Sequence, residues 1–232
     1  LDSDDWYETC YCHDLSEILS HNNADIIFAT QFIREEEDVI EIGKISIMYP
    51  DSIIDMLNSI SPYSFAMTCV KKSFWRDDLR FNEKLHYHED GEMLIRLLME
   101  KPQIFYYEKP SFHYRPGSIT HSRFTKKTLS QIDSYRVIVN HLQGINRTLD
   151  KVLNKRCTAI IAGMATQAAL DKEHDKGLDY VLKCFARENI NKAIFSNSRI
   201  SFKVKTILTA ISPRFAYFVI YKMIRGQFNA KQ

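Results

Sequence analysis

The stretch Leu1-Asp2-Ser3-Asp4-Asp5-Trp6 forms an acidic run between an apolar residue and an aromatic one. We expect Leu1 to end a strand, the acidic residues to form a turn, and Trp6-Tyr7 to open an amphipathic helix. Two carboxylates one residue apart at a strand's end can share a divalent cation that takes oxygen ligands and also contacts substrate phosphates. The run therefore favours a metal site, and the alternative is that one Asp caps the helix near Tyr7.

The composition is that of a globular protein with a core of its own. The 232 residues are 45% hydrophobic and 26% charged, which fits one or two domains. The cysteines number five, and their spacing matches neither a disulfide framework nor the clustered ligands of a zinc site. We therefore expect a reduced, cytoplasmic compartment.

Charge is divided unevenly along the chain. Residues 123–232 carry 20 Lys and Arg against 7 Asp and Glu, whereas residues 1–122 carry 11 against 22. The last 44 residues, 189–232, contain eight basic residues and no acidic one. This asymmetry suggests that the C-terminal part faces an anionic partner.

Hydrophobic periodicity predicts strands alternating with helices over residues 1–122. The helices expected there are 7–19, ended by Asn22-Asn23, one from a capping Asp51 to 60, and one opening near Asp90. The strands expected there are a buried one at 24–29, two short ones around the acidic loop 35–38, a central one at 64–70, and one at 104–107.

Residues 123–232 show helical spacing only. Helices are expected at about 127–143, 147–170, 175–188 and 203–225, the last broken by Pro213. The fold class is therefore α/β, a mixed sheet flanked by helices in residues 1–122, followed by an α-helical C-terminal region in residues 123–232.

A second cluster with chemical potential is His88-Glu89-Asp90-Gly91-Glu92, at the start of the helix near Asp90. A carboxylate at a helix N-terminus is stabilised in its ionised form by the exposed amides and the helix dipole. Such a group can accept a proton from an alcohol, as a general base must. The alternative is that Glu89 or Asp90 only satisfies backbone amides, and for Asp90 taken alone that alternative is favoured.

A third cluster is His113-Tyr114-Arg115-Pro116-Gly117-Ser118-Ile119-Thr120-His121, on a loop expected after a strand. It offers a guanidinium, two hydroxyls and two imidazoles, which suit the recognition of a diphosphate. The same residues could equally form a surface turn whose hydroxyls bond locally.

The order of these clusters resembles that of the family 2 glycosyltransferases, which have the Rossmann-like GT-A fold with a DxD motif. The resemblance covers about half of the chain, residues 1–122. It is carried by Leu1-Asp2-Ser3-Asp4-Asp5-Trp6, Lys71-Lys72-Ser73-Phe74, Leu79-Arg80-Phe81-Asn82-Glu83, Glu89-Asp90 with Arg96-Leu97-Leu98, and Tyr114-Arg115-Pro116-Gly117-Ser118-Ile119-Thr120.

The resemblance implies an inverting transfer of a sugar from a nucleotide-sugar donor, with Mg²⁺ or Mn²⁺ as cofactor. Asp2 would lie near the ribose, and Asp4, with Asp2 and Asp5 beside it, would bind the metal and donor. Asp90 would be the base, and Glu89 would hold the acceptor or orient the base.

The remaining roles that the resemblance implies concern the donor pocket. Arg115, Ser118 and Thr120 would face the leaving diphosphate, where positive charge and hydrogen-bond donors stabilise developing negative charge. Trp6 would border the sugar pocket, although an aromatic residue after a turn is more often a core anchor. His113 and His121 could add a metal ligand, and we weight a structural role higher for both.

The sequence departs from that family at its start. Family members place nucleotide-binding strand–helix units ahead of the DxD motif, whereas here Leu1 stands on the motif. We expect a truncated sequence rather than a partner that supplies the N-terminal half.

The basic C-terminal region combines apolar stripes with Lys and Arg, for example in residues 202–208 and 214–225. No apolar run approaches the roughly 20 residues of a spanning helix. Amphipathic, purely basic helices are typical of attachment to anionic lipid, and the alternative is a helix pair packed on the core with solvated charges.

These observations lead us to expect a bacterial glycosyltransferase of surface polysaccharide biosynthesis, acting on a glycan or lipid-linked acceptor at the inner face of the cell membrane. A non-catalytic fragment or pseudoenzyme that serves as an interaction module is the alternative. Nucleic-acid binding is not expected, because the aromatic residues of the basic region stand at helix-core spacing and no such motif is present.

Overall fold

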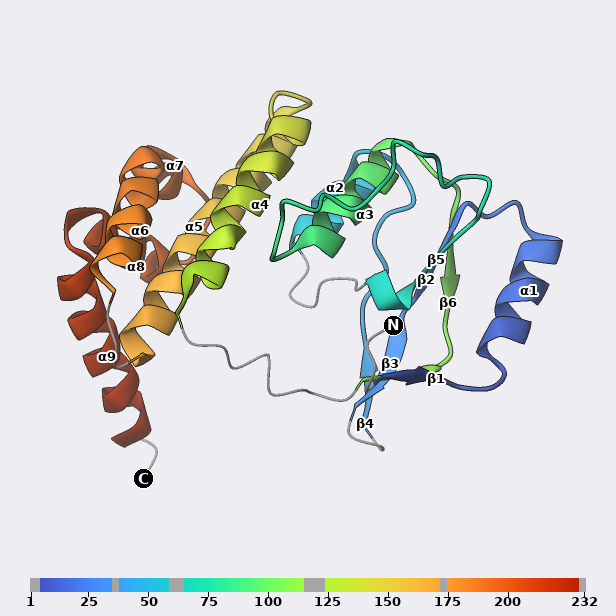
Figure 1. Ribbon diagram of the computed structural model, residues 1–232, viewed down its shortest axis with the longest axis horizontal. Helices are drawn as coiled ribbons and strands as arrows, with labels where there is room; N and C mark the ends of the chain where they lie inside the picture. Colours follow the sequence, from blue (N-terminus) through green and yellow to red (C-terminus); the bar gives the residue numbers. More distant parts are fainter. Residues whose placement is uncertain (1–4, 35–37, 59–64, 115–123, 172–174, 230–232) are drawn as a thin grey trace. The chain divides into compact units, whose positions relative to one another are not determined.

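A computed structural model describes residues 5–34, 38–58, 65–114, 124–171 and 175–229. The chain forms two compact units. The first contains residues 1–83 and 89–120, and the second contains residues 84–88 and 121–232. Figure 1 shows the strands in the first unit and a group of helices, α4 to α9, in the second.

The core of the first unit is a three-stranded sheet in the order β5-β2-β6. The central strand β2 (Ile26–Ala29) is fully buried, as its run of four apolar residues requires. It pairs in parallel with β6 (Ile104–Tyr107) and antiparallel with β5 (Thr68–Val70). The short 3₁₀ helix η1 (Phe65–Met67) leads directly into β5.

A second sheet of the first unit has the order β1-β7-β3-β4. Strand β1 (Trp6–Tyr7) pairs antiparallel with β7 (Phe112–Tyr114), which runs parallel to β3 (Gln31–Arg34). Strand β4 (Asp38–Glu41) returns antiparallel to β3. This arrangement brings the start of the chain beside a segment that is distant in the sequence.

Three helices surround the three-stranded sheet, with α1 (Tyr11–His21) on one side and α2 (Asp51–Asn58) and α3 (Glu89–Met99) on the other in Figure 1. The apolar face of α3 is almost completely excluded from water, since Met93, Leu94, Leu97 and Leu98 are all buried. Burial of that face holds the first turn of α3 in place.

The second unit is built from the helices α4 to α9. Their bounds are α4 (Lys126–Leu142), α5 (Arg147–Leu170), α6 (Lys176–Glu188), α7 (Ile190–Phe195), α8 (Ile200–Ile211) and α9 (Pro213–Asn229). The long helix α5 packs against α4, α6, α7, α8 and α9.

Small side chains allow this close packing of helices. Ala165 and Ala168 on α5, Ala210 on α8 and Ala216 on α9 are all buried in one cluster, where Phe185 and Tyr217 fill the remaining space. Because an alanine lets neighbouring backbones approach, α5 can serve as the central helix of the unit.

The mixed α/β class and the helical C-terminal region are confirmed by these elements. The helices expected near Asp51 and Asp90, and the strands expected at 24–29 and 104–107, are confirmed as well. Asp175 is the N-cap of α6, because its carboxylate accepts hydrogen bonds from the amides of Gly177 and Leu178.

Two local predictions are wrong. Trp6-Tyr7 does not open a helix but forms β1, and α1 begins only at Tyr11. The strand expected at 64–70 starts later, at Thr68, and lies at one end of the three described strands rather than in their centre. By contrast, the break expected at Pro213 is confirmed, because α8 ends at Ile211 and Pro213 is the first residue of α9, a position where the amide hydrogen that proline lacks has no helical acceptor.

Within the described part of the chain, no helix has both the length and the apolar character that crossing a membrane requires.

Candidate functional site

The pairing of β1 with β7 brings the end of the first cluster expected to carry chemistry beside the beginning of the third. The register places Trp6 opposite His113 and Tyr7 opposite Phe112. The third cluster was expected on a loop after a strand, but its first two residues, His113 and Tyr114, belong to β7 itself. The sheet, rather than a loop, therefore fixes where this cluster begins.

Side-chain contacts reinforce that backbone pairing. The ring of Trp6 stacks on the ring of His113, with centroids 4.6 Å apart and planes inclined by 11°. The His113 Nε2 atom lies 2.7 Å from Oε1 of Glu8. His113 Nδ1 is buried and has no hydrogen-bond partner among the described residues. The imidazole is thus held on two sides and keeps one unsatisfied nitrogen.

The residue that precedes β1 and the last residue of β7 stand at the same end of the β1–β7 pair. Asp5 precedes Trp6 and Tyr114 follows His113, so in an antiparallel pair they stand at one end. Asp2 and Asp4, together with Arg115, Ser118, Thr120 and His121, lie outside the described residues. Chain connectivity alone keeps Asp4 within one residue of Asp5, and Arg115 within one residue of Tyr114.

Strand β1 is also tied to the segment that leads into β5. The Tyr7 hydroxyl donates a hydrogen bond to the carbonyl oxygen of Ala66 in η1. Burial, with Cys69 and Asp5 nearby, raises the pKa of Tyr7, so the phenol stays a neutral donor. Because η1 in turn packs against α3, β1 and α3 share a neighbour.

The second cluster lies at the first turn of α3. Glu89 and Asp90 are its first two residues, where the helix dipole favours negative charge. Asp90 is half-buried, and its Oδ1 accepts a hydrogen bond of 2.7 Å from the amide of Gly91. One carboxylate oxygen therefore contacts a backbone amide at the helix terminus.

The residue before this turn has an unusual backbone. His88 has a φ of +59°, in the left-handed region that non-glycine residues rarely occupy. The left-handed conformation costs roughly 1 kcal/mol in an L-residue. Such a conformation persists only where the surroundings impose it, and it is found preferentially at functional sites.

A buried ion pair anchors α3 beneath this turn. Arg96 binds Glu92 through two bonds, Nε to Oε1 at 2.8 Å and Nη2 to Oε2 at 3.1 Å. The Glu92 side chain is 1% exposed. The same guanidinium donates to the backbone carbonyl oxygens of Asp78 and Arg80. Arg96 therefore fixes both the helix and the loop ahead of it, an interaction that the sequence analysis did not foresee.

Among the described residues, no group of three His, Cys, Asp or Glu side chains is arranged to hold a metal ion. His113 is the one predicted ligand whose surroundings are described, and its Nε2 is occupied by Glu8. Its Nδ1 is buried and has no hydrogen-bond partner among the described residues, and an imidazole nitrogen is a suitable type of ligand for a transition metal. The carboxylates expected to hold Mg²⁺ or Mn²⁺, Asp2 and Asp4, lie outside the described part.

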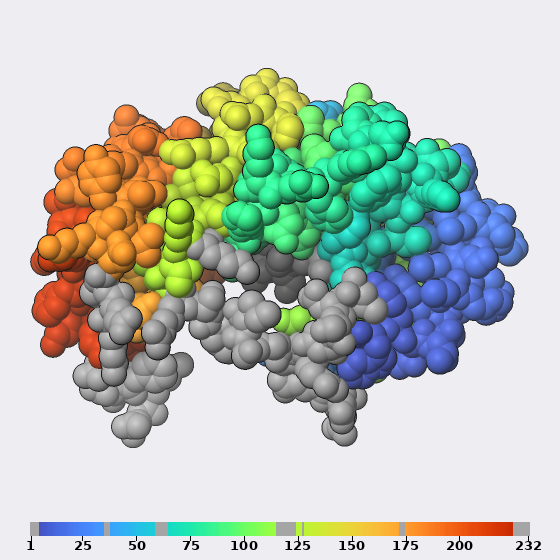
Figure 2. Space-filling view, in the orientation of Figure 1, coloured from blue at the N-terminus to red at the C-terminus, as the bar shows by residue number. Residues whose placement is uncertain are grey.

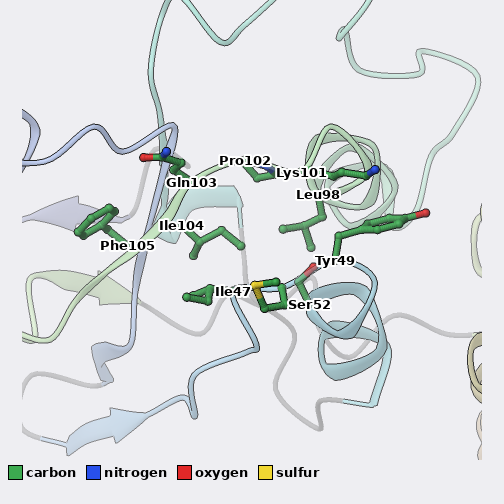
Figure 3. A pocket seen from close by; sticks show the side chains of 10 residues that line it. Ile47, Tyr49, Ser52, Leu98, Lys101, Pro102, Gln103, Ile104 and Phe105 are labelled. Carbon is green, nitrogen blue, oxygen red and sulfur yellow. The ribbon is translucent and has the colours of Figure 1, made fainter.

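The first unit also has a pocket that was not expected from the sequence. It has a volume of about 620 Å³ and is lined by the segment before α2 with the first turn of that helix, by the end of α3, and by the segment that leads from α3 into β6. Figure 3 shows Leu98, Ile104 and Ile47 around its interior and Tyr49 with Lys101 at one side. The Lys101 ammonium lies 5.2 Å from the centre of the Tyr49 ring. None of Asp5, Trp6, Glu89, Asp90 and His113 lines this pocket.

No protein-family model matches this chain, and a search of the curated proteins gives no match.

Proposed function

We propose that this protein is an inverting glycosyltransferase that moves a sugar from a nucleotide-diphosphate-sugar donor to a glycan or lipid-linked acceptor. The proposal rests on the order and content of the three clusters in the sequence. The structural observation that supports it most is the β1–β7 pairing, because it joins the acidic first cluster to the third, which is rich in phosphate-binding groups.

The joining of these clusters matters because the donor's diphosphate needs both. Carboxylates can hold a divalent cation, and a guanidinium with hydroxyl donors can stabilise the charge that develops on the leaving group. In this proposal Asp2, Asp4, Asp5 and Trp6 hold the metal and sugar side of the donor. In the same proposal, Arg115, Ser118 and Thr120, which follow β7 in the chain, contact the diphosphate of the donor.

Mg²⁺ or Mn²⁺, held by Asp4 and Asp2, would neutralise negative charge on the diphosphate. His113 and His121 are secondary candidates as ligands. The buried, unsatisfied Nδ1 of His113 is compatible with such a part, although Nε2 already contacts Glu8.

Asp90 is proposed as the general base. Its carboxylate takes the proton of the acceptor hydroxyl while the acceptor oxygen forms a bond to the anomeric carbon of the donor sugar. The bond from that carbon to the diphosphate oxygen breaks, and the nucleoside diphosphate leaves with the electron pair. The position of Asp90 in the first turn of α3, where its side chain is half-buried, suits this part. Glu89 would orient the base or hold the acceptor.

The setting that we propose is the cytoplasmic, inner face of a bacterial cell membrane, where surface polysaccharides are built on lipid-linked acceptors. The support is the excess of basic residues in the C-terminal unit, with eight basic and no acidic residues in 189–232. Nucleic acid is not among the proposed partners.

Binding of nucleoside diphosphates tests the donor site directly. The chain, together with any residues that its gene encodes ahead of Leu1, is titrated calorimetrically with UDP, GDP, CDP and ADP in the presence and absence of Mn²⁺. We expect one of them to bind in a Mn²⁺-dependent way, and Asp4→Ala to weaken binding by roughly tenfold or more. Asp77→Ala, a change at a fully exposed carboxylate, is the matched control.

Arg115→Gln should weaken binding with or without metal, because the guanidinium contacts phosphate oxygens in this proposal. Binding of no nucleoside diphosphate, with or without Mn²⁺, would move the assignment to a non-catalytic interaction module.

A further inference from the structure

The helices α7, α8 and α9 expose more large apolar side chains than a solvated helical surface needs. Phe195 is 85% exposed and Ile200 is 79% exposed. Scattered single apolar residues on a surface are normal, but a contiguous group indicates a contact surface. We call this group the apolar ridge; its members are Ile194, Phe195, Ile200, Val204, Ile211, Phe215, Phe218 and Met223.

On α8 the ridge follows one face of the helix. Ile200, Val204 and Ile211 are exposed, and Ile207, on the same stripe, is half-buried. These positions are four, three and four residues apart, which is the spacing of one helical face. The opposite face carries Thr206, Thr209 and Ala210, all of which are buried in the unit. The water-facing side of α8 is therefore its apolar side.

On α9 the exposed face is aromatic and basic. Phe215 and Phe218 are each more than half exposed, and Arg214 and Lys222 are exposed beside them. The Lys222 ammonium lies 5.7 Å from the centre of the Phe218 ring. The inward face carries Ala216, Tyr217 and Ile220, all buried. Figure 2 shows part of α9, in red, at the surface of the second unit.

The three helices that carry the ridge are packed neighbours. The Lys203 ammonium donates a hydrogen bond of 2.9 Å to the carbonyl oxygen of Ile194, which holds the end of α7 against the first turns of α8. Ile211 and Phe215 are separated by only three residues across the α8–α9 turn, so their Cα atoms lie at most about 15 Å apart. The exposed apolar residues thus lie on three consecutive helices that are joined by short connections.

The charges that residues 189–232 themselves carry are of one sign. Arg199, Arg214 and Lys222 are exposed, and no acidic residue occurs in 189–232. The carboxylate that approaches from another element, Asp179 of α6, is buried, accepts a hydrogen bond from the Tyr217 hydroxyl and lies 3.9 Å from Arg214. Lys205 points inward, where its ammonium donates to Thr166 and burial lowers its pKa.

We propose that the apolar ridge is a membrane-docking surface, which inserts its phenylalanine and isoleucine side chains into the interface of a bilayer rich in anionic lipid. A second copy of the chain would bring like charges together around the ridge, whereas an anionic headgroup layer complements them. Apolar side chains on one helix face with a basic border are the requirements of shallow, interfacial binding. This inference specifies the contact surface of the membrane attachment proposed above and stands without the transferase activity.

Vesicle sedimentation tests the surface. The probes are vesicles of pure phosphatidylcholine and vesicles with about one-third phosphatidylglycerol. We expect binding to the anionic vesicles, weakened in Phe215→Ser/Phe218→Ser by on the order of 10- to 100-fold. Arg199→Gln/Lys222→Gln should lower it by roughly fivefold per charge, from about 1 kcal/mol for each. The matched control is Ile47→Ser/Met48→Ser, which removes two comparably exposed apolar side chains of the first unit and should change nothing.

Tryptophan fluorescence distinguishes insertion of the ridge side chains into the bilayer from adsorption of the protein to the vesicle surface. A Phe218→Trp variant, compared with the unsubstituted protein, should show a blue-shifted emission and quenching by brominated lipid on anionic vesicles. Binding that is unchanged in Phe215→Ser/Phe218→Ser, or an unshifted emission spectrum of the vesicle-bound Phe218→Trp variant, would overturn the proposal. Concentration-dependent self-association lost in the double serine variant would assign the ridge to a second copy instead. Retention by DNA with no vesicle binding would assign it to nucleic acid.

Discussion

Trp6 and His113 are 107 residues apart in sequence and stack face to face, with ring centroids 4.6 Å apart. The two residues lie opposite each other on the antiparallel strands β1 and β7. This contact is where the acidic run at the start of the chain meets the segment that continues into Arg115. The proposed donor site depends on it, because the carboxylates proposed to hold the metal lie in the first segment and the guanidinium proposed to contact the diphosphate lies in the second.

The first prediction concerns the stability of that pairing. His113→Ala removes a ring that is mostly buried between Trp6 and Glu8, and we expect a loss of roughly 1–3 kcal/mol in the free energy of unfolding. His113→Phe keeps an aromatic ring for Trp6 and should cost less. Urea denaturation of both variants measures the difference, and equal losses would mean that the ring stack does not stabilise the pair.

A second prediction concerns Arg96. Arg96→Met leaves the buried Glu92 without its guanidinium, and we expect a loss of about 3–5 kcal/mol. Glu92→Gln/Arg96→Met should recover most of it, since a neutral pair of similar volume replaces the two charges. The exposed pair Arg80–Asp77 supplies the control, because Arg80→Met should have no measurable effect. An additive loss in the double variant would contradict this account.

A third prediction is a pH dependence that involves Asp14. Hydrogen bonds from Lys109 and Tyr107 hold the pKa of Asp14 below its ordinary value of 3.8. A lowered folded-state pKa means that the stabilisation is present above the unfolded-state pKa and is lost as the pH falls through the folded-state pKa. Asp14→Asn should therefore be less stable than the unsubstituted protein at pH 7, with the difference shrinking below about pH 4.

Urea midpoints for the two proteins at pH 7, 5 and 3 measure this effect. A difference that stayed constant down to pH 3 would show that Asp14 stabilises the fold by a contact independent of its charge.

A fourth prediction concerns thiol reactivity. Cys10 and Cys12 are exposed, whereas Cys157 is buried in the helical unit, where burial raises its pKa to about 11. Because only the thiolate reacts, iodoacetamide should label Cys10 and Cys12 in the folded protein and Cys157 only in urea. Peptide mass spectrometry reads the sites, and labelling of Cys157 at an equal rate without urea would refute the packing of α4 on α5.

Much of the fold follows from local sequence patterns. The apolar run at Ile26–Ala29 is long and uninterrupted enough to require burial, and the spacing of Met93, Leu94, Leu97 and Leu98 defines the inner face of α3. Asp90 is likewise located at a helix start by its sequence neighbours. These features depend on periodicity and on helix-start signals, both of which are local.

The features that sequence did not reveal depend on distant partners. Trp6-Tyr7 is a strand only because β7 pairs with it, and two residues are too few for a periodic signal. Arg96 is predictable as an exposed helical residue, and only the fold brings the carbonyl oxygens of Asp78 and Arg80 to it. The sequence shows apolar stripes in residues 202–208 and 214–225, but only the fold decides which of their side chains face solvent and which are buried.

The most direct test of the central claim is nucleotide-sugar turnover. The chain, with any residues encoded ahead of Leu1, is incubated with Mn²⁺ and a panel of nucleotide-sugars, and nucleoside diphosphate release is followed for the unsubstituted protein and for Asp90→Asn. The account predicts release from one donor, lowered by about 10²- to 10⁴-fold in Asp90→Asn while binding of that donor is kept. No release from any donor, or unchanged release in Asp90→Asn, would contradict it.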